Sequence, residues 1–315
     1  MQLPESLKKR IEESVGGFKP ADLANAASEL SARYRSGTKA ARFADSQTIR
    51  AAYLATRMPA TFAVLSNVFD QLSGLSPRSL LDLGSGPGTA LWAAAQAFEG
   101  LESATLCDSD PDMLRIGKNL VSGETARPFA GARWVMADLR NAPLDPHDLV
   151  VCSYSLGELG AQAASEVAQR AWKSAREALI VIEPGTIKGF SLIRELRGML
   201  IASGAHIAAP CPHDHECPIR DGDWCHFAAR IERTSLHRYL KTAEKGHEDE
   251  KFSYLIALKS PAPRQSARIL RHPRHHSGFI RLKLCAAGGI EDLTITRSQK
   301  ELWRKARKAK WGDEW

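Results

Sequence analysis

A glycine-rich turn in the first third of the chain has the residue types of a nucleotide-binding loop. An apolar run with one acid, Leu80–Leu83, precedes it, and an Ala- and Trp-rich run, Thr89–Phe98, follows it. That order predicts a buried strand, a tight turn and a helix. Because Gly84, Gly86 and Gly88 carry no Cβ, a ligand can approach the backbone closely, and the free N–H groups of the helix start lie beneath it. The turn therefore predicts a cofactor site at a strand-to-helix junction.

Acidic residues at the ends of the next two predicted strands are placed to complete that site. Ligands of open α/β sheets collect at the carboxyl ends of the strands. Asp108 is there to accept hydrogen bonds from both ribose hydroxyls of a nucleoside, and Asp138 to reach its adenine edge. The glycine spacing, with Asp82 ahead of it, resembles the first motif of class I S-adenosylmethionine-dependent methyltransferases. The predicted cofactor-binding residues are Asp82, Gly84, Ser85, Gly86, Gly88, Asp108, Asp138 and Ser153.

A second group of reactive side chains lies in a loop rich in Pro, Gly and Asp. Three of the six cysteines, Cys211, Cys217 and Cys225, fall within 15 residues there with the spacing C-x5-C-x7-C. Such clustering favours metal binding over disulfides, and Cys285, after a later predicted strand, can complete a set of four thiolates. Four thiolates suit either tetrahedral zinc or an iron–sulfur cluster. A zinc site of three cysteines and one histidine is the alternative, with the candidates His213, His215 and His226.

The elements that must position these residues alternate in type. From residue 79 to 186, strand-length apolar runs alternate with helical patterns, which predicts a doubly wound α/β sheet of the class I methyltransferase, Rossmann-like type. Five strands are predicted there, at Leu80–Leu83, Ser103–Cys107, Arg133–Met136, Asp148–Ser153 and Ala178–Ile182. Later apolar runs predict a sixth strand, Phe252–Leu258, and a seventh, Phe279–Leu284, which is placed at an edge of the sheet.

These patterns also predict how the chain is divided. The predicted regions are an N-terminal helical region, a cofactor-binding core, a cysteine-rich metal-binding insertion, the last strands of the sheet with a basic segment, and a basic tail. Their bounds are 1–75, 76–204, 205–245, 246–296 and 297–315. No apolar run reaches about 18 residues, and no secretory signal is visible at the N-terminus. The sequence therefore predicts a cytoplasmic, monomeric protein without a membrane span.

Positive charge is concentrated toward the end of the sequence. The net charge is +7, yet residues 264–283 alone hold six Arg or Lys residues and no acid. Residues 297–310 hold seven more, opposed by Glu301, with Trp303 and the adjacent Trp311 interleaved. A localised basic strip with aromatic residues is typical of binding to a nucleic-acid backbone; the alternative is a solvated helix face and tail. No RNA-recognition module motif appears, so specificity would come from RNA shape or single-stranded elements.

The segment after the fourth predicted strand, Ser153–Leu159, does not indicate which group would accept a methyl group. It is neither the Asn/Asp-Pro-Pro-aromatic motif of amino-group methylation nor the Pro-Cys motif of cytosine C5 methylation. We identify no catalytic base or nucleophile in it. Methyl transfer depends mainly on positioning, because the sulfonium already activates the methyl group.

Several motifs together resemble one particular family. Cys211-Pro-His-Asp, Cys217-Pro and Trp224-Cys225-His-Phe227 are similar to motifs of the family of the mitochondrial small-ribosomal-subunit assembly factor and its bacterial relatives. Further matches are Ser153–Leu159, Ile182–Thr186 and Ala306–Asp313, so the resemblance spans roughly residues 30 to 313.

This resemblance implies an S-adenosylmethionine-binding fold that carries a [4Fe–4S] cluster and binds small-subunit ribosomal RNA during assembly. The implied cluster ligands are Cys211, Cys217, Cys225 and Cys285. Three alternatives remain open. They are an active ribosomal RNA methyltransferase with a structural cluster, a non-catalytic assembly factor that uses the cofactor structurally, and a zinc-stabilised RNA-binding module.

Overall fold

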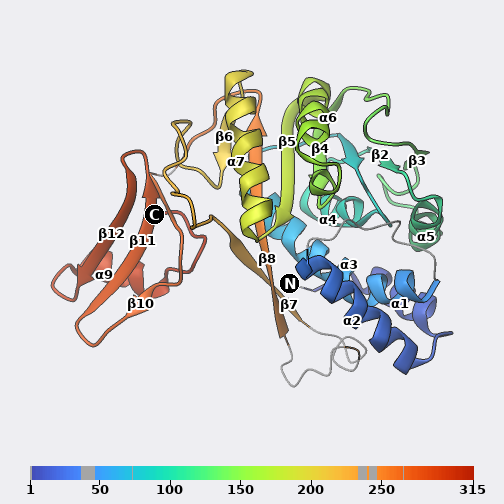
Figure 1. Cartoon of the computed structure of the whole chain (residues 1–315), viewed down its shortest axis with the longest axis horizontal. Helices are drawn as coiled ribbons and strands as arrows, with labels where there is room; N and C mark the ends of the chain where they lie inside the picture. The colour runs from blue at the N-terminus through green and yellow to red at the C-terminus, as the bar shows by residue number, and fades with distance from the viewer. Residues whose placement is uncertain (1, 37–46, 73, 233–239, 241–246, 265) are drawn as a thin grey trace.

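A mixed sheet of eight strands forms the centre of the computed structural model, which describes residues 2–36, 47–72, 74–232, 240, 247–264 and 266–315. The strand order is β3-β2-β1-β4-β5-β8-β6, and β7 pairs with β8 (Figure 1). Strands β1 to β5 pair in parallel, whereas β8 runs antiparallel to β5, β6 and β7. This is a class I methyltransferase-like arrangement, which confirms the predicted fold class at that level.

The five strands predicted before residue 186 are all present, and several are longer than predicted. They are β1 Ser79–Leu83, β2 Ser103–Asp108, β3 Arg133–Met136, β4 His147–Ser153 and β5 Ala175–Pro184. The predicted sixth strand is the second half of β8, His247–Leu258. Two further strands escaped prediction, β6 His206–Ala209 and β7 Phe227–Glu232. Both flank the polar cysteine loop, and neither contains the apolar run by which the other strands were recognised.

Helices cover both faces of this sheet, which is why its central strands are apolar on both sides. The covering helices after β1 are α4 Thr89–Ala97, α5 Pro111–Val121, α6 Ala161–Ser174 and α7 Ile187–Ala202. Leu80 belongs to the core shared with α4, whereas its neighbour Leu81 belongs to the core shared with α6 and α7. Among the described residues, no helix combines the length and apolar composition that a membrane span needs.

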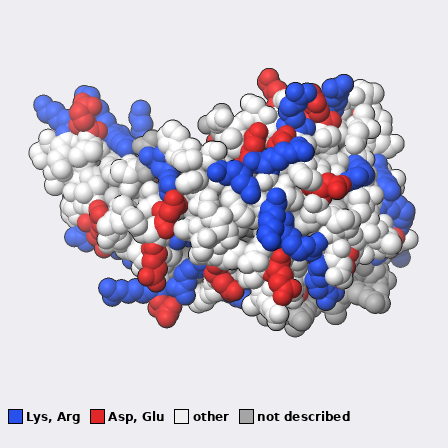
Figure 2. Space-filling model, turned by 90° about the horizontal axis from the view of Figure 1, so that it is seen from above, with Lys and Arg blue, Asp and Glu red and all other residues white. Residues whose placement is uncertain are grey.

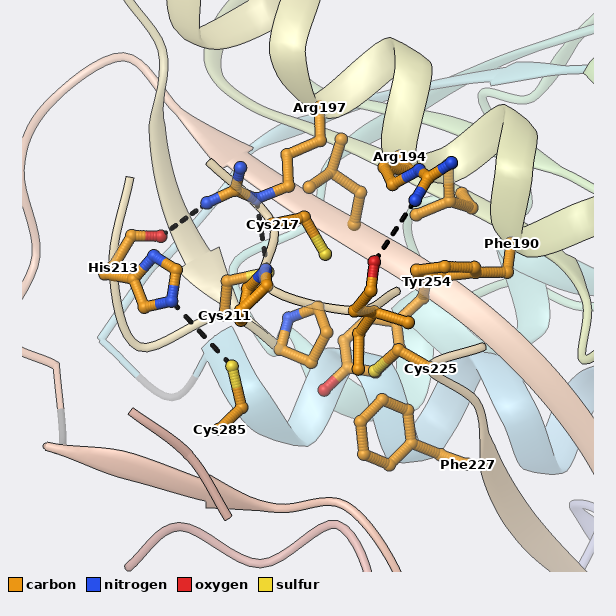
Figure 3. A pocket seen from close by; sticks show the side chains of 15 residues that line it. Phe190, Arg194, Arg197, Cys211, His213, Cys217, Cys225, Phe227, Tyr254 and Cys285 are labelled. Atoms are coloured by element: carbon orange, nitrogen blue, oxygen red, sulfur yellow. Dashed lines mark hydrogen bonds between the residues drawn. The ribbon is translucent and has the colours of Figure 1, made fainter. Parts of the chain in front are cut away.

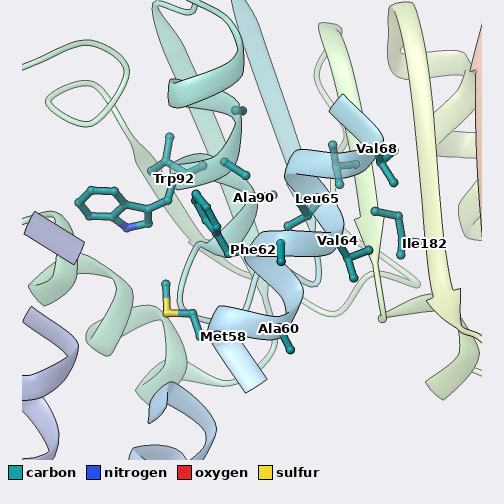
Figure 4. Close-up of a cluster of buried hydrophobic side chains, with 14 of the residues drawn as sticks. Met58, Ala60, Phe62, Val64, Leu65, Val68, Ala90, Trp92 and Ile182 are labelled. Atoms are coloured by element: carbon teal, nitrogen blue, oxygen red, sulfur yellow. The ribbon is translucent and has the colours of Figure 1, made fainter. Parts of the chain in front are cut away.

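The predicted N-terminal helical region packs directly onto the first of these cores. It contains α1 Glu5–Val15, α2 Pro20–Ser36, α3 Gln47–Phe69 and the short η1 Asp70–Leu72. In α3, Met58, Phe62 and Leu65 are at most 1% exposed, and they share a core with Trp92 of α4 and Ile182 of β5 (Figure 4). Residues 37–46 of this predicted region, and 233–239 and 241–245 of the predicted insertion, lie outside the described residues.

A second, four-stranded sheet corrects one prediction. Its strands are β9 Ala267–Ile269, β10 Arg274–His275, β11 Phe279–Ala286 and β12 Gly289–Thr296, and α9 Lys300–Lys308 packs against it. The predicted seventh strand is β11, and its placement at an edge of the main sheet is wrong. It pairs with β12 across the two-residue turn Ala287–Gly288, because a hairpin closes a far shorter loop than a return to the main sheet. Figure 1 shows this sheet at the far left, apart from the main one.

Candidate cofactor and metal sites

The predicted glycine turn is tightly packed except at one position. Gly84, Gly86 and Gly88 have φ of +79°, +51° and +82°, a region that favours glycine. A Cβ on Gly84 would lie 2.3 Å from Ser155 Cβ, and one on Gly88 would lie 2.7 Å from Trp134 Cη2. A Cβ on Gly86 would meet its nearest neighbour only at 3.9 Å. The outer glycines therefore let the turn pack, whereas Gly86 leaves its backbone open to a ligand.

Two of the predicted acids lie next to this turn. Asp108, which ends β2, accepts hydrogen bonds from the Gly86 N–H at 2.7 Å and the Asp110 N–H at 2.8 Å. Asp82 in β1 is 2% exposed. Burial, with a further contribution from Asp108, raises the pKa of Asp82 to about 8. A buried acid beside a half-buried one favours a ligand that brings positive charge.

Three buried polar atoms along the same edge of the sheet lack a hydrogen-bond partner within the described part of the chain. They are Asp82 Oδ2, Thr89 Oγ1 at the start of α4, and Ser153 Oγ at the end of β4. Buried polar atoms are normally hydrogen-bonded, so these three are available to a bound molecule. The residues present therefore fit S-adenosylmethionine, whose sulfonium and ammonium groups are cationic and whose ribose carries hydroxyl groups.

The remaining predicted acid, Asp138, has a different partner. It follows β3 in a turn, and its carboxylate accepts hydrogen bonds from Arg140 Nε at 2.9 and 3.0 Å. These hydrogen bonds lower the pKa of Asp138. A nucleoside that used Asp138 at its adenine edge would have to share or displace Arg140.

Two further carboxyl groups lie near the glycine turn. The sequence offered Glu158 as a helix cap or a contact to the cofactor region, and it gave Glu183 no role. Glu183, at the end of β5, is 2% exposed and accepts a hydrogen bond from the Gly157 N–H at 2.9 Å. Burial raises its pKa to about 7, with nearby Glu158 adding to the shift. Burial and then Asp108 raise the pKa of Glu158 to about 7 as well, although its side chain keeps contact with solvent. The sequence signal for these two glutamates is their position: Glu158 lies in the motif Ser153–Leu159, and Glu183 lies in the motif Ile182–Thr186.

The four predicted metal ligands line a single cavity (Figure 3). Cys211, Cys217 and Cys225 reach it from the loop between β6 and β7, and Cys285 reaches it from β11, 60 residues after Cys225. No group of three or more His, Cys, Asp or Glu side chains in the described ranges is arranged to hold a metal ion as it stands. As a donor set, four thiols around one cavity fit a thiolate-held metal group.

One of the candidate zinc ligands also borders this cavity. His213 lines it, and its Nε2 atom lies 3.8 Å from Cys285 Sγ. His226 instead stacks on Trp224, with ring centroids 5.0 Å apart. His215 stacks on His213 at 5.6 Å. Of the three histidines, His213 is therefore the one placed to join or replace a thiolate.

A buried arginine lies against the cavity. Arg197 of α7 is 4% exposed; its Nε donates to Cys211 Sγ at 3.2 Å, and a terminal nitrogen donates to the His213 carbonyl at 2.7 Å. Its guanidinium forms no ion pair with a carboxylate among the residues that the structure describes. Burying an unpaired charge is costly, so the cavity is built to receive a compensating negative group.

The state of the thiols depends on that group. Burial raises the pKa of Cys211, Cys225 and Cys285, for Cys285 to about 12. Without a metal they are therefore protonated at neutral pH. A bound metal deprotonates coordinating thiols, which converts the donor set into the negative group that Arg197 requires.

Three of the six Arg and Lys residues in the first basic run, residues 264–283, hold the cysteine loop in place. Arg264 pairs with Asp214 at 2.7 Å, and Arg271 pairs with Asp223. Arg268, 4% exposed, donates to the Pro210 carbonyl at 2.9 Å. The sequence predicted phosphate contacts for the whole run. The structure instead gives these three arginines protein partners, which a count of charges cannot foresee.

Most of the other Arg and Lys residues in the two basic runs, residues 264–283 and 297–310, lie in the second sheet and α9. Figure 2 shows Lys and Arg side chains gathered with some acids at the left end of the molecule, where this unit lies. Within it, the exposed cations include Arg274, Arg281, Lys300, Arg307 and Lys308.

Residues 47–315 match the sequence model of a family described as mitochondrial small ribosomal subunit Rsm22. The human ribosome assembly protein METTL17, mitochondrial, is 29% identical over 287 residues, which cover 83% of this chain and 61% of that protein. The Rsm22-cox11 tandem protein 2, mitochondrial, of Schizosaccharomyces pombe is 26% identical over 323 residues, which cover 83% of this chain and 42% of that protein. The chain thus spans less than two thirds of the length of these relatives.

Solved structures with a similar fold are more distant. An O-methyltransferase family protein from Burkholderia thailandensis has a TM-score of 0.46 at 15% identity, covering 76% of this chain and 69% of that one. Magnesium protoporphyrin IX methyltransferase from Synechocystis has a TM-score of 0.44 at 15% identity, covering 74% and 95%. With TM-scores below 0.5, neither likeness is close enough to bear on function.

The relatives overturn the predicted location. The sequence predicted a cytoplasmic protein, whereas the human and yeast relatives are named as mitochondrial proteins. The prediction rested on composition and on the lack of an apolar signal, and neither property separates these two compartments.

Proposed function

The chain belongs to the Rsm22 family of the mitochondrial small ribosomal subunit, and from that premise we propose a function in small-subunit assembly. In this proposal the protein binds S-adenosylmethionine at the glycine turn, holds a [4Fe–4S] cluster through four cysteines, and binds small-subunit ribosomal RNA. A human relative is named a ribosome assembly protein. This chain spans 61% of the length of that relative. We therefore assign the role of the relative to this chain only as a proposal.

The observation that carries the metal part is the contact between Arg197 and Cys211. A buried guanidinium without a carboxylate partner in the described structure donates to the sulfur of one of four thiols that line the same cavity. A metal group held by four thiolates supplies the negative charge that this guanidinium needs. The test is analysis of iron, acid-labile sulfide and zinc in protein purified without oxygen. Iron and sulfide with absorbance near 400 nm support the cluster, whereas one equivalent of zinc without sulfide refutes it.

The cofactor part is supported by the open Gly86 backbone and the unsatisfied Asp82 and Ser153 side chains. S-adenosylmethionine, when bound, supplies a methyl group on a cationic sulfur. The residues of this chain orient it: Asp82 offsets positive charge, and Asp108 accepts hydrogen bonds from the ribose. Titration calorimetry with S-adenosylmethionine measures this binding directly. Absence of any binding heat in metal-loaded protein contradicts this part of the proposal.

The RNA part is supported by the exposed cations of the second sheet and α9. Because arginines at 264, 268 and 271 tie this unit to the cysteine loop, loss of the metal is expected to loosen the unit and weaken RNA binding. Fluorescence anisotropy with labelled small-subunit ribosomal RNA, in metal-loaded and metal-stripped protein, measures both effects.

A second candidate is an active ribosomal RNA methyltransferase, favoured by the acids near the glycine turn. Glu158 and Glu183 have pKa values raised to about 7, so either can take up a proton at neutral pH. We nevertheless expect little or no transfer of labelled methyl groups to undermethylated small-subunit RNA, because the segment Ser153–Leu159 carries neither of the two acceptor motifs. Stoichiometric methylation of one nucleotide, lost in Glu158→Gln, would promote this candidate over the first.

A further inference from the structure

Two arginines stand directly opposite each other on the second sheet. In the antiparallel pair β10–β11, Arg274 is in register with Arg281. Both side chains are exposed, and neither forms an ion pair among the described residues. Like charges placed opposite one another across strands are destabilising. A negative group bound over these two arginines would relieve this repulsion.

The alternation of β11 places these arginines on the same face as a cysteine of the metal cavity. Ile280, Leu282 and Leu284 face the core that the sheet shares with α9. The residues between them point to the other face, so Arg281 and Cys285 lie on one side of the strand, about 13 Å apart along it. Cys285 meets the cysteine loop at one end of this face, whereas Arg281, at the other end, is exposed to solvent.

Neighbouring side chains orient this exposed end. The Arg281 guanidinium lies over the Phe279 ring at 5.1 Å, and His276 stacks on the same ring at 4.3 Å. Lys283 adds a third cation, and Asp292, opposite it in the register, offsets part of that charge. Thr294 lies opposite Arg281. Held cations beside an aromatic ring and hydroxyl groups match the chemistry of a sugar–phosphate backbone.

Four of the five cations of α9, all except Lys300, have local electrostatic explanations instead. Lys305, Arg307 and Lys308 lie in its last turn, where positive charge complements the helix dipole. Arg304 pairs with Glu301 at 3.1 Å. The charge on the helix therefore contributes to the stability of the protein alone, whereas the Arg274–Arg281 pair opposes it.

We propose that this open face of the second sheet, formed by Arg274, Phe279, Arg281 and Lys283, binds the phosphate backbone of small-subunit ribosomal RNA. The inference rests on the proposed function and assigns its RNA contact to one face of one sheet. A single strand, β11, then carries a metal ligand at one end and the RNA contact at the other.

The test compares two charge-matched double variants, Arg274→Glu/Arg281→Glu on the open face and Lys300→Glu/Arg307→Glu on α9. Each changes the net charge equally, and unchanged iron content together with a cooperative melting transition establishes that both are folded. RNA affinity is measured by anisotropy over a range of salt concentrations. We expect the open-face variant to bind at least about tenfold more weakly and to lower the slope of log K against log salt by about 2, as for two lost phosphate contacts. The α9 variant is expected to change affinity by less than about threefold.

Equal losses in both variants, or a larger loss in the α9 variant, overturn the assignment to this face and leave the proposed RNA binding intact. Absence of RNA binding by the unaltered, metal-loaded protein refutes both the RNA part of the proposed function and this inference. Loss of iron in the open-face variant calls for the milder pair Arg274→Gln/Arg281→Gln. The expected reduction in salt slope is the same for that pair.

Discussion

Replacing Arg197 with methionine is expected to change stability differently with and without the metal. Methionine keeps much of the arginine's apolar volume and removes its charge and its donors. In loaded protein, the variant loses the hydrogen bond to Cys211 Sγ, which is 3.2 Å long in the structure. The hydrogen bond to the His213 carbonyl is lost in both states. Only in stripped protein does the variant also remove an unpaired buried charge.

The two states give different magnitudes. Hydrogen bonds to charged groups contribute about 1.5 to 3 kcal/mol, so loss of the bond to Cys211 is expected to cost the loaded variant about 2 kcal/mol, in addition to the cost at the His213 carbonyl. In the stripped protein, removal of the buried charge stabilises the variant, and loss of the donor to the His213 carbonyl destabilises it. Each effect amounts to about 1 to 4 kcal/mol, so the two offset each other. Its net change is therefore expected to be near zero. The loaded variant is therefore destabilised more than the stripped one by at least about 2 kcal/mol, which corresponds to metal binding weakened about 30-fold or more.

Denaturant unfolding of loaded and stripped protein, both kept without oxygen, measures the two free energies of unfolding. Chelator competition measures the change in metal affinity independently. Arg194→Met is the matched control, because Arg194 lines the same cavity but donates to the Ile219 carbonyl at 3.2 Å rather than to a thiol. Equal destabilisation of the loaded and stripped Arg197→Met protein would refute the reasoning, since the arginine would then serve the fold and not the metal group.

Three further predictions concern the two sites. Gly86→Asp places a carboxylate at the open position of the turn, so we expect calorimetric binding of S-adenosylmethionine to vanish. The control Gly100→Asp, in a distant open turn, is expected to bind normally. Binding by the Gly86 variant would disprove the site. Cys225→Ser should lose iron, become protease-sensitive within residues 205–230 and bind RNA more weakly, whereas Cys152→Ala, outside the cavity, should do none of these. Because burial raises the pKa of Asp82 from 3.8 to about 8, its contribution to stability is present below about pH 4 and lost as pH rises through about 8. The melting temperature of cofactor-free protein should therefore fall between about pH 4 and about pH 8, and a fall of the same size in Asp82→Asn would contradict this.

The glycine turn and Asp108 could be located from the sequence because their geometry is local. A strand, a glycine turn and a helix follow one another directly, and the acid at the end of the next parallel strand necessarily lies beside the turn, as the hydrogen bond from the Gly86 N–H to Asp108 shows. Asp138 follows the same rule, but its partner Arg140 is two residues away. Strand order predicts which edge a side chain reaches, and not which neighbour it contacts there.

The surroundings of the cysteine cavity depend on long-range contacts, and the sequence foresaw less of them. The sequence offered Cys285 as the fourth thiol of the set, although it placed the strand of Cys285 in the wrong sheet. Arg197 lies in an amphipathic helix, where an arginine is usually exposed, so its burial could not be predicted. Arg268 counted toward a basic strip, because a charge run does not reveal that Glu314 and the Pro210 carbonyl will surround one of its members.

The contacts of Arg268 set an order of events during synthesis. This arginine holds the Pro210 carbonyl beside the cysteine loop and also binds the Gly312 carbonyl and the Glu314 carboxylate. Glu314 follows Cys225 by 89 residues, so the ribosome makes it about 5 to 20 s later at ~5–20 residues per second. Through that interval the loop lacks its clamp and its thiols are open to oxidation. The contacts that fix Arg268 beside the loop are therefore complete only after residues 312–315 have been made.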